Sequence, residues 1–305
     1  MTIRLGLQIP NFSYGTGVSE LFPTVIAQAQ EAEAAGFDSV FVMDHFYQLP
    51  GLGSPDQPML EAYTALGALA TATERVQLGT LVTGNTYRNP TLLAKAVTTL
   101  DVVSAGRAIL GLGAGWFELE HEQLGFEFGT FTERFNKLNE ALEIILPMLA
   151  GERPTVTGNY YRTRDAMANP RYRDHIPLLI GGSGEKKTIP LAVAHFDHLN
   201  LIASLDELPR KLAVVRDRCA EIGRDPASLE TSTLLTVVVD EKASLDQLPE
   251  AFRSRAAVGS AEAVAEQIKT KVFDVGLTGV IFNMPVYTPG AVAAVAEALR
   301  PMLPA

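Results

Sequence analysis

The stretch Ser39-Val40-Phe41-Val42-Met43-Asp44-His45-Phe46 joins an apolar run directly to an acid and an imidazole. A continuous apolar run is typical of a strand that is covered on both faces, as in a parallel sheet. Asp44 and His45 then follow the carboxyl end of this strand. In barrels of parallel strands that end carries the chemistry. The rest of the chain decides whether it forms such a barrel.

Strand-like runs rich in Val, Ile and Leu alternate with helical periodicity along the whole chain. The runs are residues 3–9, 39–44, 76–82, 107–112, 177–181, 198–203, 232–239 and 279–284. Eight strand–helix units predict one α/β domain, residues 1–305, with the (β/α)8 TIM-barrel fold. A doubly wound open sheet would show the same alternation. The count of eight and the lack of G-x-G-x-x-G after the first run favour the barrel.

Capping patterns mark the ends of several predicted helices. Ser19 is expected to cap the first helix, and Gly36 is expected to end it. Thr130 and Glu133 form a capping-box pattern before the clearest amphipathic stripe. Ser260 is expected to open a later helix. These signals predict where three of the helices begin.

The longest interval between two predicted strands lies between the fourth and the fifth. One helix fills part of it, and residues 152–176 are rich in Pro, Arg, Tyr and Asn. A loop this long is uncommon in a compact domain unless it is functional. We therefore expect an insertion over the active face that serves as a lid or substrate wall. A surface ornament is the alternative.

The composition limits the classes of partner. The chain has 305 residues, 47% of them hydrophobic, with a formal net charge of -10 and a pI of about 5.1. Nucleic acid is not an expected partner, because phosphate binding needs a basic face. No run approaches the ~18 apolar residues that span a membrane, and residues 1–7 lack the pattern of a signal peptide. We expect a cytoplasmic protein in which the single cysteine, Cys219, is a packed thiol.

Asp44 and His45 are the first candidates for chemistry. An acid and an imidazole at a strand's carboxyl end can bind a ligand and move a proton. The functional interpretation is that Asp44 hydrogen-bonds a cofactor ring while His45 acts on the substrate. In the alternative, Asp44 caps backbone amides in a turn.

Two glycine clusters close later strands. Gly111, Gly113 and Gly115 end the fourth strand, where residues without side chains let a flat ligand approach the backbone. The cluster Gly181-Gly182-Ser183-Gly184 ends the fifth strand, before two lysines and a helix. Free amides at a helix N-terminus, with a hydroxyl and lysines, suit a phosphate. A tight rim and a glycine-rich turn are the structural alternatives.

A dense polar set follows the third strand, next to the Asp44–His45 strand. Neutral donors and acceptors of this kind orient a ligand without needing charge. The set comprises Thr80, Thr83, Asn85, Tyr87 and Arg88. Turn chemistry is the simpler explanation for the Asn89-Pro90 end of this segment.

Several chemistries lack their signatures. No lysine ends a predicted strand, so a Schiff-base aldolase is not expected. The five histidines show no HExxH pattern and no matching carboxylate cluster, so no metal site is expected. A serine hydrolase would need a G-x-S-x-G elbow, which is missing.

Taken together, four stretches resemble the luciferase-like monooxygenase superfamily, within its coenzyme F420 (deazaflavin) dependent oxidoreductase branch. The resemblance runs from about residue 3 to 204 and returns at the last strand. Its most specific pieces are Met43 to Phe46, Gly79 to Pro90, Gly111 to His121 and Pro177 to Gly182.

The resemblance implies a TIM-like barrel that holds a deazaflavin or flavin at the carboxyl ends of its strands. Asp44 would hydrogen-bond the ring, and His45 would act on the substrate as the second catalytic residue. A non-prolyl cis peptide would form a bulge under the ring, best matched by Leu81-Val82. The other cofactor-binding residues it implies are Asn85, Gly113, Gly181, Gly182, Ser183 and Gly184, with the last four at the phosphate, joined by Lys186 or Lys187.

One position departs from the family pattern. The sugar-phosphate dehydrogenases of this family carry a catalytic Glu just after the glycines of strand four, whereas Trp116 and Phe117 stand there, followed by Glu118. We therefore expect a more apolar small-molecule substrate. The resemblance implies hydride transfer between the deazaflavin and a carbonyl, imine or activated alkene. Related proteins are often dimers, so a homodimer is also implied.

Three other functions are compatible with parts of this pattern. An FMN-dependent monooxygenase on the same fold is the main alternative, with FMN as its cofactor. A non-catalytic flavin-binding barrel would tolerate loss of Asp44 and His45. An NAD-dependent Rossmann dehydrogenase is disfavoured by the missing fingerprint.

Overall fold

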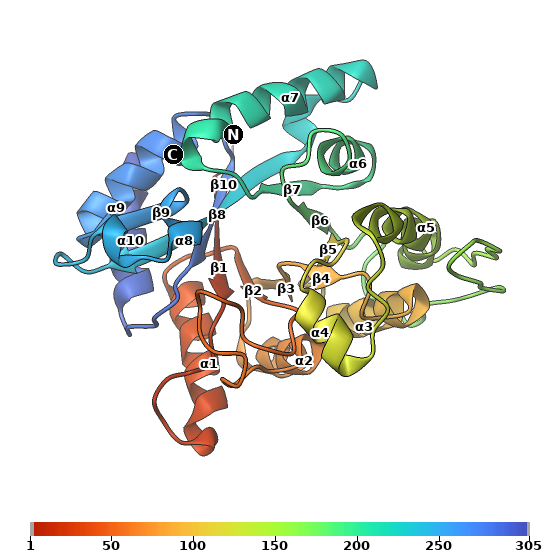
Figure 1. Cartoon of the computed structure of the whole chain (residues 1–305), viewed down its shortest axis with the longest axis horizontal. Helices are drawn as coiled ribbons and strands as arrows, with labels where there is room; N and C mark the ends of the chain where they lie inside the picture. Colours follow the sequence, from red (N-terminus) through yellow and green to blue (C-terminus); the bar gives the residue numbers. More distant parts are fainter. Residues whose placement is uncertain (1–2, 304–305) are drawn as a thin grey trace.

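The computed structural model describes residues 3–303. Within these residues, parallel strands close into a barrel surrounded by helices, as the alternation of the sequence predicts (Figure 1). Met1, Thr2, Pro304 and Ala305 lie outside the described residues, including the first two positions of the N-terminal stretch considered above. No helix of the described chain is long and apolar enough to span a bilayer.

The barrel strands follow one another around the ring, and the last closes on both its neighbours. Their bounds are β1 (Arg4–Ile9), β2 (Ser39–Val42), β3 (Gln77–Thr80), β5 (Ala108–Gly113), β6 (Leu178–Gly181), β7 (His198–Leu201), β8 (Glu230–Val239) and β10 (Gly279–Asn283). β10 pairs in parallel with β1 and also with β8, where Gly279 is opposite Ser232. This double pairing closes the sheet, so the barrel is confirmed and the open doubly wound sheet is excluded.

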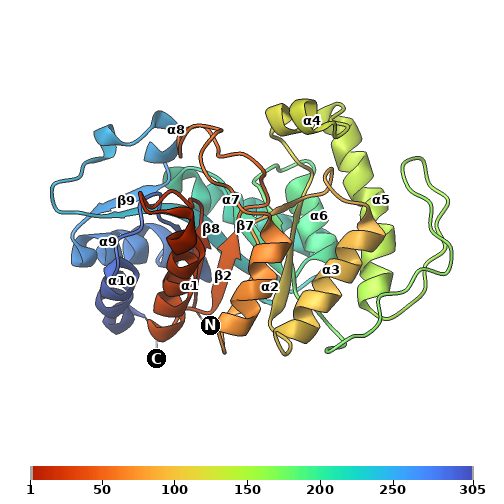
Figure 2. The same cartoon turned by 90° about the horizontal axis from the view of Figure 1, so that it is seen from below.

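One helix covers the outside of the barrel after each strand (Figure 2). These helices are α1 (Val18–Ala34), α2 (Ala62–Ala72), α3 (Pro90–Val103), α5 (Phe131–Leu149), α6 (Thr188–His195), α7 (Leu208–Glu221), α9 (Ala261–Ile268) and α10 (Ala291–Leu299). Short elements lie in the connections, namely β4 (Thr83–Gly84), α4 (Glu118–Leu124), α8 (Glu250–Arg253), β9 (Ala256–Gly259), η1 (Leu205–Glu207), η2 (Pro226–Ser228), η3 (Leu245–Gln247), η4 (Lys269–Phe273) and η5 (Arg300–Met302).

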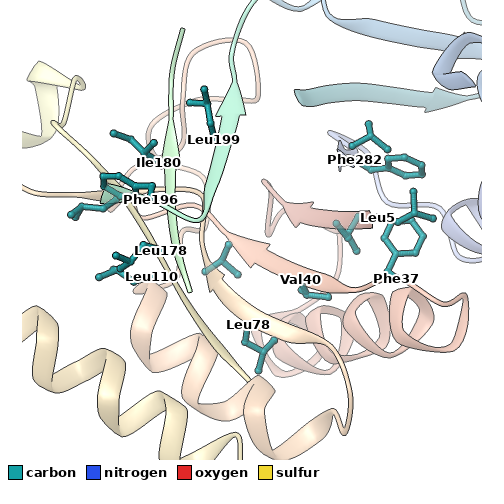
Figure 3. Packing of buried hydrophobic residues seen from close by; sticks show 14 of the residues in the cluster. Leu5, Phe37, Val40, Leu78, Leu110, Leu178, Ile180, Phe196, Leu199 and Phe282 are labelled. Carbon is teal, nitrogen blue, oxygen red and sulfur yellow. The ribbon is translucent and has the colours of Figure 1, made fainter. Parts of the chain in front are cut away.

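Two layers of apolar side chains explain why the strands read as continuous apolar runs. Successive side chains of a strand point to opposite faces. The outer layer packs between strands and helices and includes Val40, Leu110 and Phe282 (Figure 3). The inner layer fills the barrel and consists of Phe41, Leu81, Ile109, Leu179 and Ile281.

A polar cluster occupies the barrel interior toward the amino ends of the strands. Nε2 of His198 lies 2.6 Å from Oγ of Ser232, which also accepts a hydrogen bond from Asn200 at 2.7 Å. Arg4 donates to Glu230 beside this cluster at 3.1 Å. Burial, and then the charge of Arg4, lower the pKa of His198 to about 3. This end of the barrel is therefore sealed around a neutral imidazole.

Most of the predicted helix ends are confirmed, and one is wrong. The capping box of α5 is complete, because Thr130 Oγ1 accepts from the Glu133 amide and the Glu133 carboxylate accepts from the Thr130 amide. Ser260 caps α9 as predicted, and Gly36 follows the end of α1 with φ of +90°. Ser19 is not a cap, because α1 already begins at Val18, after Gly17.

The connection from α5 to β6 lies on the flank of the barrel and not over the active face. Asn169 accepts a hydrogen bond from Lys95 of α3, and Arg173 binds Asp101 near the end of the same helix. The hairpin around Thr157 stands beside α5 (Figure 2). The reason is topological, since the segment leaves a helix at the amino end of the barrel and must enter β6 at that same end. The expected lid is therefore wrong for most of residues 152–176, of which the Tyr161 hydroxyl reaches Asn85 after β4.

Candidate active site

Asp44 follows β2 and is buried in an ion pair. Its Oδ2 accepts hydrogen bonds from Nη1 of Arg88 at 2.6 Å and from the Gly84 amide at 3.2 Å. Arg88 also donates to Glu61 at 2.6 Å, and its guanidinium lies 4.9 Å from the centre of the Tyr63 ring. Arg88 therefore holds the Asp44 carboxylate in one orientation.

The second oxygen of Asp44 remains available to a ligand. Among the described residues, no donor contacts Oδ1, and it does not belong to the enclosed polar atoms without partners. Burial raises the pKa of Asp44, and the charge of Arg88 and its hydrogen bonds only partly counteract this effect. The site thus offers one free acceptor from a carboxyl group whose charge is balanced by one guanidinium.

His45 is paired with a carboxylate that the sequence did not single out as functional. Nδ1 of His45 lies 2.9 Å from Oε2 of Glu120, on α4. The side chain of Glu120 is fully buried, and that of His45 is 11% exposed. Glu120 stood inside one of the family-like stretches without an assigned role. The only indication in the sequence was an acidic residue shortly after the glycines of β5. The contact between Glu120 and His45 could not be predicted, because the two residues lie far apart in the sequence.

Aromatic side chains border His45. The Trp116 and Phe117 rings meet the imidazole edge-on, with ring centres 5.7 and 5.8 Å away. Phe117 is buried, whereas Trp116 is 59% exposed. An exposed indole beside a candidate proton-transfer group forms an apolar wall that a substrate can contact.

The polar set after β3 supports the site instead of facing a ligand. Thr80 Oγ1 and Thr83 Oγ1 lie 2.6 Å apart, and Thr83 Oγ1 also lies 2.7 Å from the Tyr63 hydroxyl. Tyr87 donates to Glu120 at 2.5 Å, and Arg88 is engaged with Asp44 as described. The prediction that these groups orient a ligand directly is therefore wrong for these four, because their hydrogen bonds are used within the protein.

Asn85 joins the end of β4 to two other segments. Its Nδ2 donates to the Tyr161 hydroxyl at 3.3 Å, while its backbone amide donates to the Gly113 carbonyl at 2.9 Å. The side chain is almost fully buried, and Oδ1 has no partner among the described residues. Oδ1 is therefore the atom of Asn85 that remains for the expected contact with a cofactor, which stays a prediction.

Val82 and two glycines form a side-chain-poor surface at the carboxyl ends of three strands. The Leu81–Val82 peptide bond is cis, as the resemblance implied. A Cβ added to Gly113 would lie 2.8 Å from Cγ2 of Val82, and one added to Gly181 would lie 3.2 Å from Cγ1. The Val82 side chain thus occupies the space that a side chain at Gly113 or Gly181 would enter, more tightly at Gly113. We call Val82, Gly113 and Gly181 the Val82 cradle.

The loop after β6 presents amides at the start of α6. Among the described residues, the backbone N–H groups of Ser183, Gly184 and Glu185 donate no hydrogen bond. The loop is held from outside, because Lys211 donates to the Ser183 carbonyl at 3.0 Å and to Glu185 at 2.7 Å. Gly182 has φ of +136°, in the left-handed range that favours glycine.

Lys187 lies at the same end of the barrel. Its Nζ is 3.4 Å from Thr132 Oγ1 and 5.1 Å from the centre of the Phe131 ring, at the start of α5. Free amides at the start of a helix are suited to an anion, whereas the contacts of Lys187 are with the start of α5. The structure therefore places Asp44, the Val82 cradle and the 182–184 loop at the carboxyl-terminal end of the barrel.

The sequence is similar to proteins of known activity. A glucose-6-phosphate dehydrogenase of Microbacterium testaceum, named F420-dependent, is 41% identical over 160 residues, which cover 52% of this chain and 46% of that protein. A hydroxymycolic acid dehydrogenase of Mycobacterium tuberculosis, also named F420-dependent, is 33% identical over 242 residues, covering 76% and 65%. The chain spans about half the length of the first of these curated relatives.

Solved structures share the fold. An F420-dependent secondary alcohol dehydrogenase in complex with an F420-acetone adduct superposes with a TM-score of 0.85 at 20% identity, covering 98% of this chain and 99% of that chain. A long-chain alkane monooxygenase superposes with a TM-score of 0.80 at 15% identity, covering 99% and 91%. The model of the luciferase-like monooxygenase family matches residues 3–245. On this match, the chain belongs to the luciferase-like monooxygenase family.

Proposed function

We propose that this protein is a coenzyme F420-dependent oxidoreductase that moves a hydride between the deazaflavin and a small organic substrate. The observation that carries the proposal is the Val82 cradle, which lies at the same carboxyl-terminal end of the barrel as the free Oδ1 of Asp44 and the accessible imidazole of His45. The curated relatives named F420-dependent dehydrogenases support the choice of cofactor.

The residues present fit a deazaflavin with a phosphate-bearing side chain. A planar ring needs a surface without protruding side chains, and Gly113 and Gly181 provide one around Val82. A phosphate needs free donors, and the amides of Ser183 and Gly184 provide them. In this assignment Asp44 Oδ1 accepts from the ring, and Leu81 and Val82 support it.

When bound, the deazaflavin supplies the two-electron hydride chemistry, while the barrel supplies position and a dry pocket. His45 lies where a substrate oxygen can meet its imidazole, and it would hold or release one proton there. Asp44 would keep the ring in register with that proton-transfer group. Arg88 maintains the position of Asp44 through its ion pair.

The substrate class follows from the walls of the site. Trp116 and Phe117 stand beside His45, so the group next to the reacting carbon is expected to be apolar. An alcohol–carbonyl pair fits best, because one imidazole can exchange the hydroxyl proton. The exposed edge of Trp116 leaves room for an aliphatic or aromatic substituent.

Cofactor titration tests the proposal. Purified protein is titrated with oxidised coenzyme F420 and, separately, with FMN, and binding is followed by fluorescence. Oxygen uptake beyond that of the reduced flavin alone is then measured with FMN that a flavin reductase and NADH keep reduced. We expect saturable binding of coenzyme F420, its reduction by a secondary alcohol, and no oxygen uptake. Tight FMN binding with oxygen consumption and no affinity for coenzyme F420 would instead establish the alternative, an FMN-dependent monooxygenase.

A further inference from the structure

Glu120 is enclosed and accepts hydrogen bonds through both carboxylate oxygens. Oε1 accepts from the backbone amides of Phe46 and Tyr47, the latter at 2.8 Å. Oε2 accepts from the Tyr87 hydroxyl at 2.5 Å and contacts His45 Nδ1 at 2.9 Å. The carboxylate therefore bridges the loop after β2, the loop after β4 and the helix α4.

These contacts favour the ionised form of Glu120. A carboxylate can only accept hydrogen bonds, and two amides and a phenol supply donors to it. Burial raises the pKa of Glu120, but the hydrogen bond and the positive charge that His45 can supply, together with the hydrogen bonds from Tyr87 and the Tyr47 amide, outweigh it, so the pKa is lowered overall. An ionised Glu120 requires a proton on the nitrogen of His45 that it contacts.

The other nitrogen of His45 has no partner within the part of the chain that the structure describes. Nε2 makes no hydrogen bond, and the enclosed polar atoms without partners do not include it. Trp116 and Phe117 hold the imidazole edge-on. The ring therefore presents a single nitrogen to the space in which a substrate would bind.

We propose that Glu120 is the positioning residue of the active site: in the uncharged His45 ring it holds the proton on Nδ1 and thereby makes Nε2 the atom that exchanges a proton with the substrate. The proposal rests on the proposed function for its role in turnover. The tautomer itself follows from the Glu120 contacts alone, so it can be tested without cofactor or substrate.

The proton balance of the reaction follows from this arrangement. In the oxidation of an alcohol, the hydroxyl proton would pass to Nε2 while the hydride, with its electron pair, leaves the carbinol carbon for the deazaflavin. The alcohol would become a carbonyl, with its electron pair on the bound deazaflavin, and His45 would carry the proton as a cation. Glu120 stabilises that cation directly across the ring. In the reverse direction, Nε2 returns the proton to the carbonyl oxygen.

Charged and titratable groups surround His45 on several elements. Asp44 precedes it in the chain after β2, Tyr87 lies after β4, and Glu120 and His121 lie on α4. Burial lowers the pKa of His121, whose Nδ1 contacts the Phe117 carbonyl. Glu120 is thus the carboxylate in direct contact with the imidazole, and it is the group to change.

The decisive experiment records the ring ¹⁵N shifts of His45 in the cofactor-free protein by NMR, at a pH where the imidazole is neutral, with His45→Gln used to assign the signals. We expect a protonated Nδ1 and an unprotonated Nε2 in the unmodified protein. In Glu120→Gln, the new amide can donate to Nδ1, so the proton should move to Nε2. An Nε2–H tautomer in the unmodified protein would overturn the proposal, even if the variant does not fold.

Steady-state kinetics with coenzyme F420 and an alcohol that the protein oxidises give the second readout. Glu120→Gln should lower kcat by about 100-fold with KM changed by less than about threefold, because it alters the proton acceptor and not the binding contacts. Glu120→Asp, which keeps the charge, should recover part of the rate. Glu122→Gln, at an exposed position of α4, is the control. Equal rates for Glu120→Gln and the control would refute the role of Glu120 in turnover. Absence of turnover in the unmodified protein and in all variants would refute the proposed function. The NMR result would then still decide the tautomer of His45.

Discussion

Arg88 Nη1 lies 2.6 Å from Oδ2 of Asp44, and only 11% of the Arg88 side chain and 1% of the Asp44 side chain are exposed. Removing one partner of such a pair leaves the other charge buried without compensation, which is more costly than the pair itself is stabilising. The pair therefore ties the stability of the fold to the geometry of the proposed cofactor site.

We predict that Arg88→Met lowers the free energy of unfolding by about 3 kcal/mol at pH 7. Denaturation with urea, followed by circular dichroism, measures the change. Arg153→Met is the matched control, because Arg153 pairs with Asp165 at 3.0 Å on the surface, where both side chains are exposed. The control should lose less than about 1 kcal/mol. Equal losses in both variants would show that removing one partner of the buried Arg88–Asp44 pair costs no more than removing one partner of an exposed pair.

A second prediction concerns the pH dependence of stability. The pKa of His198 in the folded protein is about 3, below its ordinary value of 6.5, because burial disfavours the charged imidazole. Below its ordinary pKa the unfolded chain binds a proton that the folded chain does not. The stabilisation is therefore complete above about pH 6.5 and is lost as the pH falls toward 3.

His198→Asn should reduce this loss. Between pH 6.5 and 5, the free energy of unfolding should fall by about 2 kcal/mol less in the variant than in the unmodified protein. His195→Asn, at an exposed position of α6, should leave the pH dependence unchanged. Urea denaturation at a series of pH values gives both slopes. A variant with the slope of the unmodified protein would mean that His198 is protonated in the fold.

The eight-stranded plan could be predicted because its signals are local. Each buried run is short and continuous, and alternate residues serve the two apolar layers, as Val40 and Phe41 do. The capping box at Thr130 and Glu133 is likewise complete within four residues. Glycines at the strand ends indicated a surface where another group approaches the backbone closely, and the Val82 cradle is such a surface.

The remaining features depend on contacts between distant segments. His45 and Glu120 are separated by 75 positions, and no local pattern shows that they meet. Arg88 and Asp44 are separated by 44. Residues 152–176 also show that local sequence does not predict where a segment lies. Their composition suggested a functional lid, but the direction of α5 determined their location. Sequence periodicity therefore predicts the barrel, whereas the site depends on side-chain contacts between residues that are distant in sequence.

The Val82 cradle leads to a third prediction. Gly113→Ala and Gly181→Ala should each weaken the binding of coenzyme F420 by about tenfold or more, equivalent to about 1.4 kcal/mol, because the added methyl group displaces Val82. Fluorescence titration measures the affinity. In Gly67→Ala, within α2, the new Cβ meets no atom within 4 Å. That control should keep its affinity and gain about 0.5–1 kcal/mol of stability. Unchanged affinity in both cradle variants would exclude a ring at this surface.

The support of the 182–184 loop leads to a fourth prediction. Lys211 holds the Ser183 carbonyl, so Lys211→Met should release the loop and weaken the binding of coenzyme F420 by about tenfold. Affinity for the deazaflavin that carries the ribityl chain without the phosphate should stay the same. Lys242→Met, at an exposed position, should affect neither ligand. If Lys211→Met weakened both ligands equally, the loop would not be the phosphate site.

The proposed function requires the cofactor ring to lie at the Val82 cradle, and a crystal structure of the protein with oxidised coenzyme F420 measures the position of the ring directly. We predict that the ring lies on Val82 between Gly113 and Gly181, with Oδ1 of Asp44 in hydrogen-bond distance and the phosphate at the amides of Ser183 and Gly184. A ring bound elsewhere, with the Val82 cradle in contact with solvent, would contradict the proposed cofactor site.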